Sequence, residues 1–129
     1  IRGMFSGCQS LIELDLSIFD MGEISNKQNM LYRCDSLEIL KSFKNLGKGY
    51  AKRLQNNNYC TLNLSYSIKL TYESLIDVIT NGLYDLNLTY NVANGGTLRT
   101  QKLILGATNL AKLTAEEIAI ATNKGWTVS

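Results

Sequence analysis

The feature that most constrains the fold of this chain is an internal repeat, in which residues 4–14 recur as residues 30–40. The two copies share five identities and one similar pair in a single register: Met4/Met30, Cys8/Cys34, Ser10/Ser36, Leu11/Leu37, Leu14/Leu40 and the pair Phe5/Leu31. A period in the twenties accommodates one short strand and one connecting arc. The chain is therefore expected to repeat one small unit rather than to fold around a single irregular core.

The sequence of each unit indicates how the units pack. Leu14-Asp15-Leu16 alternates with period two, so the two leucines face one side of a strand and Asp15 faces the other. A unit with one apolar edge cannot bury that edge alone, and stacking is expected to bury Met4, Cys8, Leu11 and Leu14 against Met30, Cys34, Leu37 and Leu40. These features predict an α/β leucine-rich-repeat solenoid fragment, with short stacked parallel strands and helices or turns on the outer side.

The three cysteines are predicted to be structural. Cys8 and Cys34 recur at one position of the arc, where a small apolar residue would pack, so replacing either by serine should destabilise the stack. Cys60 also follows at the repeat spacing, but its neighbours do not match the unit and the spacing is interpreted as coincidence. The cysteines are too far apart for a zinc motif and histidine is absent, so no metal and no cofactor is expected.

A different duplication occupies the second half of the chain. Residues 62–65 and 70–75 correspond to residues 103–106 and 113–118, and each copy is predicted to form a strand, a turn and a helix. Thr71 and Thr114 are suited to cap helix N-termini, and Thr114 with Glu117 forms a capping box. At the same distance after each threonine stands a glycine, Gly82 or Gly125, suited to a left-handed C-cap.

The helical periodicity also predicts buried positions. The inner faces are predicted to be Leu75, Val78 and Ile79 in the first helix, and Ile118, Ala121 and Thr122 in the second, with Trp126 folding back onto the core. Residues 86–96 are interpreted as a hairpin-like insertion, with an inserted loop as the alternative. Residues 48–58 are predicted to be a linking loop.

Several motifs resemble those of a known family. Residues 4–11 and 14–20, followed by Ile24-Ser25-Asn26 and Met30, resemble the repeat of BspA-like bacterial surface proteins. Lys27 replaces a methionine that this family usually has, and residues 21–23 depart from its usual Thr-Ser-Asn, as in a worn terminal copy. The resemblance implies two parts: residues 1–46 as BspA-like coils, and residues 47–129 as strand-helix repeats that cap the solenoid.

The resemblance also supplies the functional hypothesis. It implies a non-enzymatic module of a bacterial cell-surface or secreted protein, mediating adhesion to a host or bacterial surface protein or to a glycan. The alternative is a structural spacer, or a repeat module of a phage fibre or tail, with no ligand of its own. A hydrolase attached to repeats is a third and weaker hypothesis, because the chain lacks histidine and shows no convergent acid–base cluster.

If the chain binds a partner, repeat architecture predicts that the site lies on the concave strand face. The outward positions there are predicted to be Glu13, Asp15, Glu38, Asn63, Lys102 and Ile104. Stacked strands could bring Glu13 near Glu38 or Asp15 near Lys41, although a solvated strand face explains the same residues more simply.

Composition excludes some partners. The net charge of +2, from 13 basic and 11 acidic residues, lacks the basic stripe of a nucleic-acid-binding protein. A mild basic run, Lys41, Lys44, Lys48, Lys52 and Arg53, is interpreted as wet surface. No apolar run approaches the roughly 18 residues that span a bilayer, so no membrane contact is expected. No signal peptide or anchor is recognisable, and because residue 1 falls inside a repeat the chain is interpreted as part of a longer protein.

Overall fold

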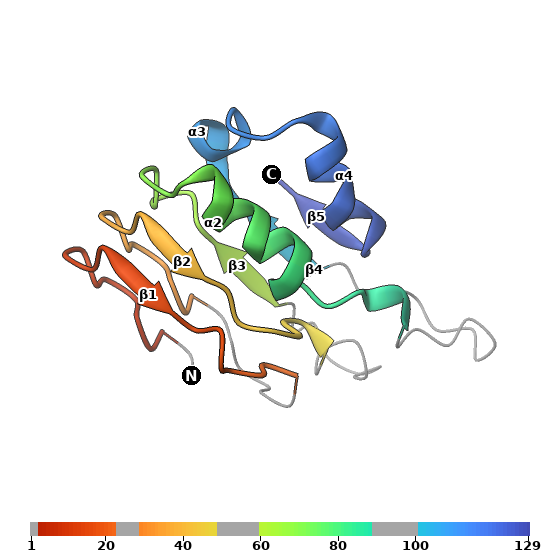
Figure 1. The fold of residues 1–129 in the computed structure, drawn as a ribbon, viewed down its shortest axis with the longest axis horizontal. Coiled ribbons are helices and arrows are strands. Elements are labelled where there is room, and N and C mark those ends of the chain that lie inside the picture. The colour runs from red at the N-terminus through yellow and green to blue at the C-terminus, as the bar shows by residue number, and fades with distance from the viewer. Residues whose placement is uncertain (1–2, 23–28, 49–59, 89–100) are drawn as a thin grey trace.

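The computed structural model describes residues 3–22, 29–48, 60–88 and 101–129, and we refer to these ranges as the first, second, third and fourth segments. The chain has a mixed α/β fold whose short parallel strands form two small open sheets (Figure 1). Successive segments are joined by equivalent hydrogen bonds. The prediction of an α/β fold with short parallel strands is therefore confirmed.

The first sheet contains one strand from each of the first two segments. Strand β1 (Glu13–Asp15) pairs in parallel with β2 (Ile39–Lys41), and Leu14 lies opposite Leu40. This register is the one in which the two copies of the sequence repeat align. Leu40 is buried, whereas the side chains of Glu13 and Asp15 are exposed, as the period-two pattern predicts.

The same turn precedes β1 and β2, and it occurs a third time in the third segment. In each turn the central residue donates its N–H to the carbonyl three positions before it, and its own carbonyl accepts from the residue three positions after it. The turns are Phe5–Cys8–Leu11, Leu31–Cys34–Leu37 and Leu64–Ser67–Leu70. The third copy was missed in the sequence, because serine replaces cysteine and Ser67 follows Cys34 at a longer spacing than Cys34 follows Cys8.

The cysteine position of the turn has a polar role. Cys34 is buried, and its Sγ donates to the Phe5 carbonyl oxygen at 3.0 Å. Ser67 Oγ makes the equivalent bond to the Cys34 carbonyl at 2.8 Å, and Asn109 Nδ2 donates to the Leu64 and Ser67 carbonyls at 3.0 and 3.2 Å. Each segment is thus tied to the previous one by a side-chain donor, which the purely apolar interpretation of the cysteines did not include.

Backbone conformation repeats with the same period. Gly3 and Asn29 have φ of 66° and 59°, and Gly7 and Arg33 have φ of 77° and 63°. Both pairs have the spacing of the sequence repeat. Glycine reaches this left-handed region without a steric penalty and asparagine tolerates it, whereas arginine adopts it at a cost of roughly 1 kcal/mol. The arc therefore demands one backbone shape at positions where the side chains differ.

In the third segment the arc is followed by helix α2 (Tyr72–Asp77), whereas in the first two segments it is followed by a strand. Leu40 N donates to Ser74 Oγ at 3.0 Å, and Ser42 N donates to Asp77 Oδ2 at 2.7 Å. Residues three apart share one face of a helix, while alternate residues of a parallel strand turn their N–H groups to the same side. Ser74 and Asp77 thereby supply the acceptors that a neighbouring strand would offer to β2, so α2 ends the first sheet.

The second sheet is formed by the last two segments. Strands β3 (Thr61–Asn63), β4 (Gln101–Ile104) and β5 (Trp126–Val128) are parallel and lie in that order. Between β4 and β5 the chain forms helices α3 (Gly106–Leu110) and α4 (Ala115–Asn123). Strand β5, which ends near the C-terminus, pairs with β4 and forms the outer strand of this sheet (Figure 1).

The predicted helix caps are confirmed except at one glycine. Thr71 accepts from Ser74 N, and Thr114 forms the capping box with Glu117. Gly125 follows α4 with φ of 88°, as a left-handed C-cap requires. Gly82 is not such a cap, because it lies within the π-helical turn η1 (Val78–Gly82) and its φ is not positive. A Cβ at this position would run into Ser42 Oγ, so close approach explains the glycine.

Trp126 confirms one packing prediction, while Thr122 contradicts another. Trp126 is buried and its Nε1 donates to the Tyr84 carbonyl at 3.0 Å. The predicted inner positions Leu75, Val78, Ile79 and Ala121 are buried and Ile118 is half-buried. Thr122 is exposed, and its hydroxyl donates to the Ala119 carbonyl within the helix. The buried face of α4 is therefore narrower than the periodicity predicted.

The predicted insertion is only partly within the described residues. Leu86–Leu88 forms a 3₁₀ turn (η2) and not a strand, because Leu86 is buried and its N–H donates to the Lys124 carbonyl at 2.9 Å. The remainder of the insertion, residues 89–96, lies outside the described residues. So does the predicted linking loop, apart from Lys48.

Burial of the repeat differs between its two copies. Met30, Cys34, Leu37 and Leu40 are buried, as the stacking prediction requires. Their counterparts in the first segment are not: Met4 is 56% exposed, and Cys8, Leu11 and Leu14 are half-buried. The second segment has described neighbours on both sides, whereas the first has one only on the side of β2. The stacking prediction is therefore correct for the second copy. In the first copy Cys8, Leu11 and Leu14 pack against the core but are only half-buried, and the prediction is wrong for Met4.

Candidate binding face

The outward side chains of β1 and β2, together with the start of α2, form a surface that we call the strand–helix face. It contains two shallow open hollows that meet at Ile39 and Lys41. Ile39 is 40% exposed, which places an apolar group at the middle of a charged surface. The members of the face are Glu13, Asp15, Ile39, Lys41, Thr71, Glu73 and Asp77.

Asp15 and Lys41 form the pair that the sequence predicted. Asp15 Oδ2 lies 3.9 Å from Lys41 Nζ, and both side chains are well exposed, so the pair contributes little to stability. Two hydrogen bonds hold the Asp15 carboxylate more firmly, from Ser17 Oγ at 2.6 Å and Ser17 N at 2.9 Å. These bonds, followed by the charge of Lys41, lower the pKa of Asp15.

The hydrogen bonds between Asp15 and Ser17 form a short turn after β1, and an equivalent turn follows β3. Asn63 Oδ1 accepts from Ser65 N at 3.0 Å and from Ser65 Oγ at 2.7 Å. Asp15 and Asn63 therefore share a local role, in which a side-chain acceptor folds the chain away from the strand two positions later. The polarity of these two predicted site residues is partly explained by this turn.

The two glutamates of the predicted site are exposed and do not face each other directly. Glu13 lies opposite Ile39 in the ladder, one position beyond Glu38. Glu38 donates its N–H to the Ile12 carbonyl at 2.8 Å, and its carbonyl accepts from Thr71 N at 3.0 Å. The backbone of Glu38 is thus fixed on both sides, while its side chain remains exposed to solvent.

The other predicted site residues lie on the second sheet. Lys102 pairs with Thr61, and Asn63 pairs with Ile104. Within the described residues no ladder joins β2 to β3, since α2 occupies the free edge of β2. The structure therefore places Glu13 and Asp15 on the strand–helix face, whereas Glu38 does not line its hollows. Asn63, Lys102 and Ile104 lie on the other sheet.

Sequence reasoning missed the contribution of α2 to this face. Glu73 and Asp77 add two carboxylates to the face beside Glu13 and Asp15, against a single basic group, Lys41. Asp77 also accepts from Asn81 Nδ2 at 2.7 Å, so its second oxygen is engaged as well. The available signal was the third arc at Ser67, which shows that α2 follows at the place where β1 and β2 follow their arcs.

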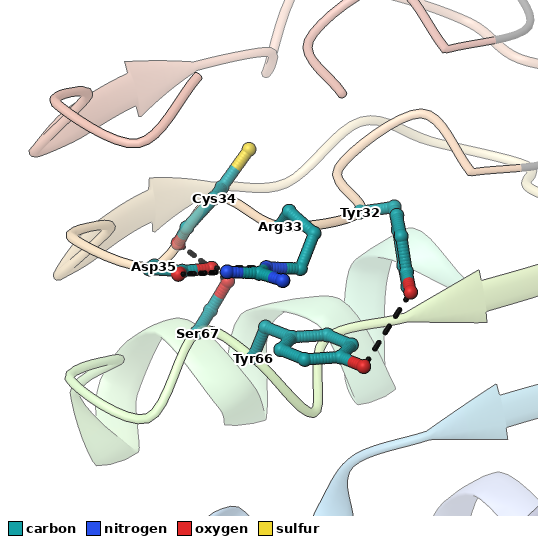
Figure 2. Close-up of polar contacts among 6 residues, drawn as sticks. All are labelled: Tyr32, Arg33, Cys34, Asp35, Tyr66 and Ser67. Atoms are coloured by element: carbon teal, nitrogen blue, oxygen red, sulfur yellow. Dashed lines mark hydrogen bonds and ion pairs between the residues drawn. The ribbon is translucent and has the colours of Figure 1, made fainter. Parts of the chain in front are cut away.

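A second exposed feature lies on the arc side of the stack, and we call it the tyrosine cluster: Tyr32, Arg33, Asp35 and Tyr66. The rings of Tyr32 and Tyr66 meet edge to face with centroids 5.0 Å apart, and Arg33 Cζ lies 4.7 Å from the centroid of Tyr66 (Figure 2). Arg33 also makes a two-pronged ion pair with Asp35, at 3.0 and 3.2 Å. Asp35 raises the pKa of Arg33. The cluster joins the second and third segments.

The parts of the chain that the structure describes hold neither a cluster of metal ligands nor a membrane-spanning helix. No three histidine, cysteine, aspartate or glutamate side chains gather there in a way that could hold a metal ion. None of the helices in the four segments is long and apolar enough to span a membrane. Of the predicted basic run, Lys41 and Lys44 are exposed and Lys48 is half-buried above the ring of Tyr84, while Lys52 and Arg53 lie outside the described residues.

Comparison with protein-family models, with curated proteins and with solved structures gives no significant match for this chain.

Proposed function

We propose that this chain is a non-enzymatic module of the leucine-rich-repeat solenoid type, and that its strand–helix face binds a protein or glycan at a cell surface. The observation that carries the proposal is the exposed, shallow face with Ile39 at its centre and carboxylates around it. A flat surface of this kind suits a macromolecular partner better than a small molecule, which usually binds in a deep concave pocket.

The support for a solenoid is the recurrence of the same connections from one segment to the next. The arc turn occurs three times, and its side-chain donor reaches the previous segment at Cys34, Ser67 and Asn109. Repeat proteins are held together by such nearest-neighbour contacts. The location at a bacterial cell surface rests on the resemblance of residues 1–46 to BspA-like repeats.

The rigidity of the face also favours binding. Its side chains stand on two strands and a helix that are cross-linked by the bonds of Leu40 and Ser42 to α2. Groups held on such elements lose little conformational entropy when a partner binds. The excess of carboxylates over Lys41 favours a partner with basic groups or with hydroxyl donors, as glycans have.

The test is saturable binding of the labelled chain to a glycan array and to intact host and bacterial cells. A Glu13→Lys variant should weaken binding at least tenfold, because it reverses a charge on the face while the backbone ladder of β1 is unchanged. Asp15→Asn keeps the turn to Ser17 and removes only the charge, so it should weaken binding less.

Glu116→Lys is the matched control, since Glu116 is an exposed carboxylate on α4 that does not line the hollows of the strand–helix face. If both reversals weaken binding equally, a general charge effect replaces a site. If the chain binds no glycan and no cell, the spacer or virion-module hypothesis takes the place of this proposal.

A further inference from the structure

The outer side of the first segment is an apolar surface that no described residue covers. A hollow there is lined by apolar side chains alone: Met4, Phe5, Leu16, Phe19, Met21 and Met30. Ile18 beside it is 87% exposed, and Ile12 is 52% exposed. An exposed apolar patch on a folded domain is typical of a surface that contacts another protein, a ligand or a membrane.

The second segment shows what kind of element fits there. Met30 is 2% exposed, whereas Met4, one repeat earlier, is 56% exposed. The same contrast holds for the other repeat positions, where Leu31, Cys34, Leu37 and Leu40 are buried and Phe5, Cys8, Leu11 and Leu14 are half-buried. The first segment packs against these positions of the second segment and buries them. No described segment packs in the same way against the equivalent positions of the first segment, which are therefore more exposed.

The backbone points the same way. Leu16 N donates to the Lys41 carbonyl and the Ile12 carbonyl accepts from Ile39 N, so these residues turn their polar groups toward β2. Alternate residues of a parallel strand turn theirs to the opposite side, which places the groups of Glu13 and Asp15 at a free edge. At the other end of the fold β5 covers the corresponding edge of β4. Among the described residues the outer edge of β1 therefore has no partner strand.

We propose that this outer face of the first segment binds one further unit of the kind formed by residues 4–29, joined to the same polypeptide and stacked in parallel as the first segment stacks on the second. The preceding unit would cover Met4 and pair with β1. Its arc would offer a carbonyl to Cys8 Sγ, as the arc of Phe5 does to Cys34 Sγ.

A second copy of the chain fits this face less well. Two identical faces related by a twofold axis would place the two β1 edges antiparallel. The repeat positions of one copy would then not meet the equivalent positions of the other in register. The exposed carboxylates of Glu13 and Asp15 would also face their own copies across the axis.

The inference does not depend on the proposed binding function, since it concerns the outer side of the first segment and not the strand–helix face. The test inserts a second copy of residues 4–29 between Gly3 and Met4, so that its last residue precedes Met4 as Asn29 precedes Met30. The cysteine of the added copy is replaced by alanine, and modification of Cys8 by a thiol reagent is followed in the native protein.

Cys8 is half-buried in the chain as it stands, whereas Cys34 and Cys60 are buried, so Cys8 should react first. A Cys8→Ala variant identifies its kinetic phase. The added unit should slow the modification of Cys8 at least tenfold and raise the urea midpoint of unfolding. A control copy with aspartate in place of both Leu14 and Leu16 should leave the rate at its original value.

Equal rates with and without the added unit would overturn the proposal. A concentration-dependent protection of Cys8 in the unmodified chain, with a dimer in sedimentation, would also overturn it, because a second copy would then occupy the face.

Discussion

Ser67 Oγ donates a 2.8 Å hydrogen bond to the carbonyl oxygen of Cys34, whose own Sγ makes the equivalent bond to the carbonyl of Phe5 at 3.0 Å. One position of the repeat is therefore a buried donor, and cysteine and serine both fill it. This relationship revises what substitutions there should do. The sequence alone predicted that serine at a repeat cysteine would be destabilising.

Cys34→Ser should be tolerated, with a change in the free energy of unfolding below about 1 kcal/mol, because the hydroxyl keeps the donor. Cys34→Val, of similar shape but without a donor, should cost about 1 kcal/mol more than Cys34→Ser. Urea unfolding followed by circular dichroism measures both. Equal losses for serine and valine would mean that the bond to Phe5 contributes nothing, and a larger loss for serine would restore the apolar interpretation.

The bonds from β2 to α2 should protect individual amides. Asp77→Ala removes the acceptor of Ser42 N and should cost about 1–3 kcal/mol, because that amide then has no partner within the sheet. Hydrogen exchange of the Ser42 amide should accelerate together with the loss of stability. Glu73→Gln, on the same helix but without a bond to β2, is the control. Unchanged exchange at Ser42 in Asp77→Ala would show that the helix does not act as the neighbour of β2.

Gly47 and Trp126 should be energetically coupled. Gly47 has φ of 93°, and a Cβ there would lie 2.7 Å from Trp126 Cζ2. Gly47→Ala should therefore destabilise by about 1–3 kcal/mol, through overpacking and backbone strain together. Trp126→Leu removes the ring that a side chain at position 47 would meet. The stability loss of the double variant should therefore be smaller than the sum of the losses of the two single variants. Strict additivity in thermal unfolding would mean that only the backbone of Gly47 matters.

Glu117 should make stability depend on pH in the acidic range. Its carboxylate accepts from the Tyr72 hydroxyl and from Thr114 N, and chiefly the bond from Tyr72 lowers its pKa below the ordinary 4.5. The unfolded chain then binds the proton more readily than the folded chain. The stabilising contribution is therefore complete above pH 4.5 and is lost as the pH falls through the lowered pKa.

The difference in unfolding free energy between the natural chain and Glu117→Gln should accordingly be largest near neutral pH and should shrink on acidification. Tyr72→Phe is the companion variant, and it should remove most of that pH dependence while the capping box remains. A difference that does not change with pH would assign the role of Glu117 to the capping box alone.

Local patterns in the sequence are enough to predict the individual strands, turns and helix starts. The spacing of the repeat set the register of β1 on β2, because identical side chains at one spacing demand identical neighbours. The period-two leucines set the inner and outer sides of β1. The threonine caps set the starts of α2 and α4, since capping depends on groups a few positions apart.

Which units become neighbours depends on contacts that exist only in the folded chain. That α2 would lie along β2 depends on Ser74 and Asp77 meeting the amides of Leu40 and Ser42, far earlier in the chain, and no local pattern states such a pairing. The same cause divided the predicted site, because α2 ends the first sheet and leaves Asn63 and Lys102 on the second. Gly82 was assigned to a cap for the same reason, since its close neighbour Ser42 is distant in sequence. Local hydrogen bonds and periodicity depend on residues that are close in sequence. The pairing of units depends on side chains that are distant in sequence and meet only when the chain is folded.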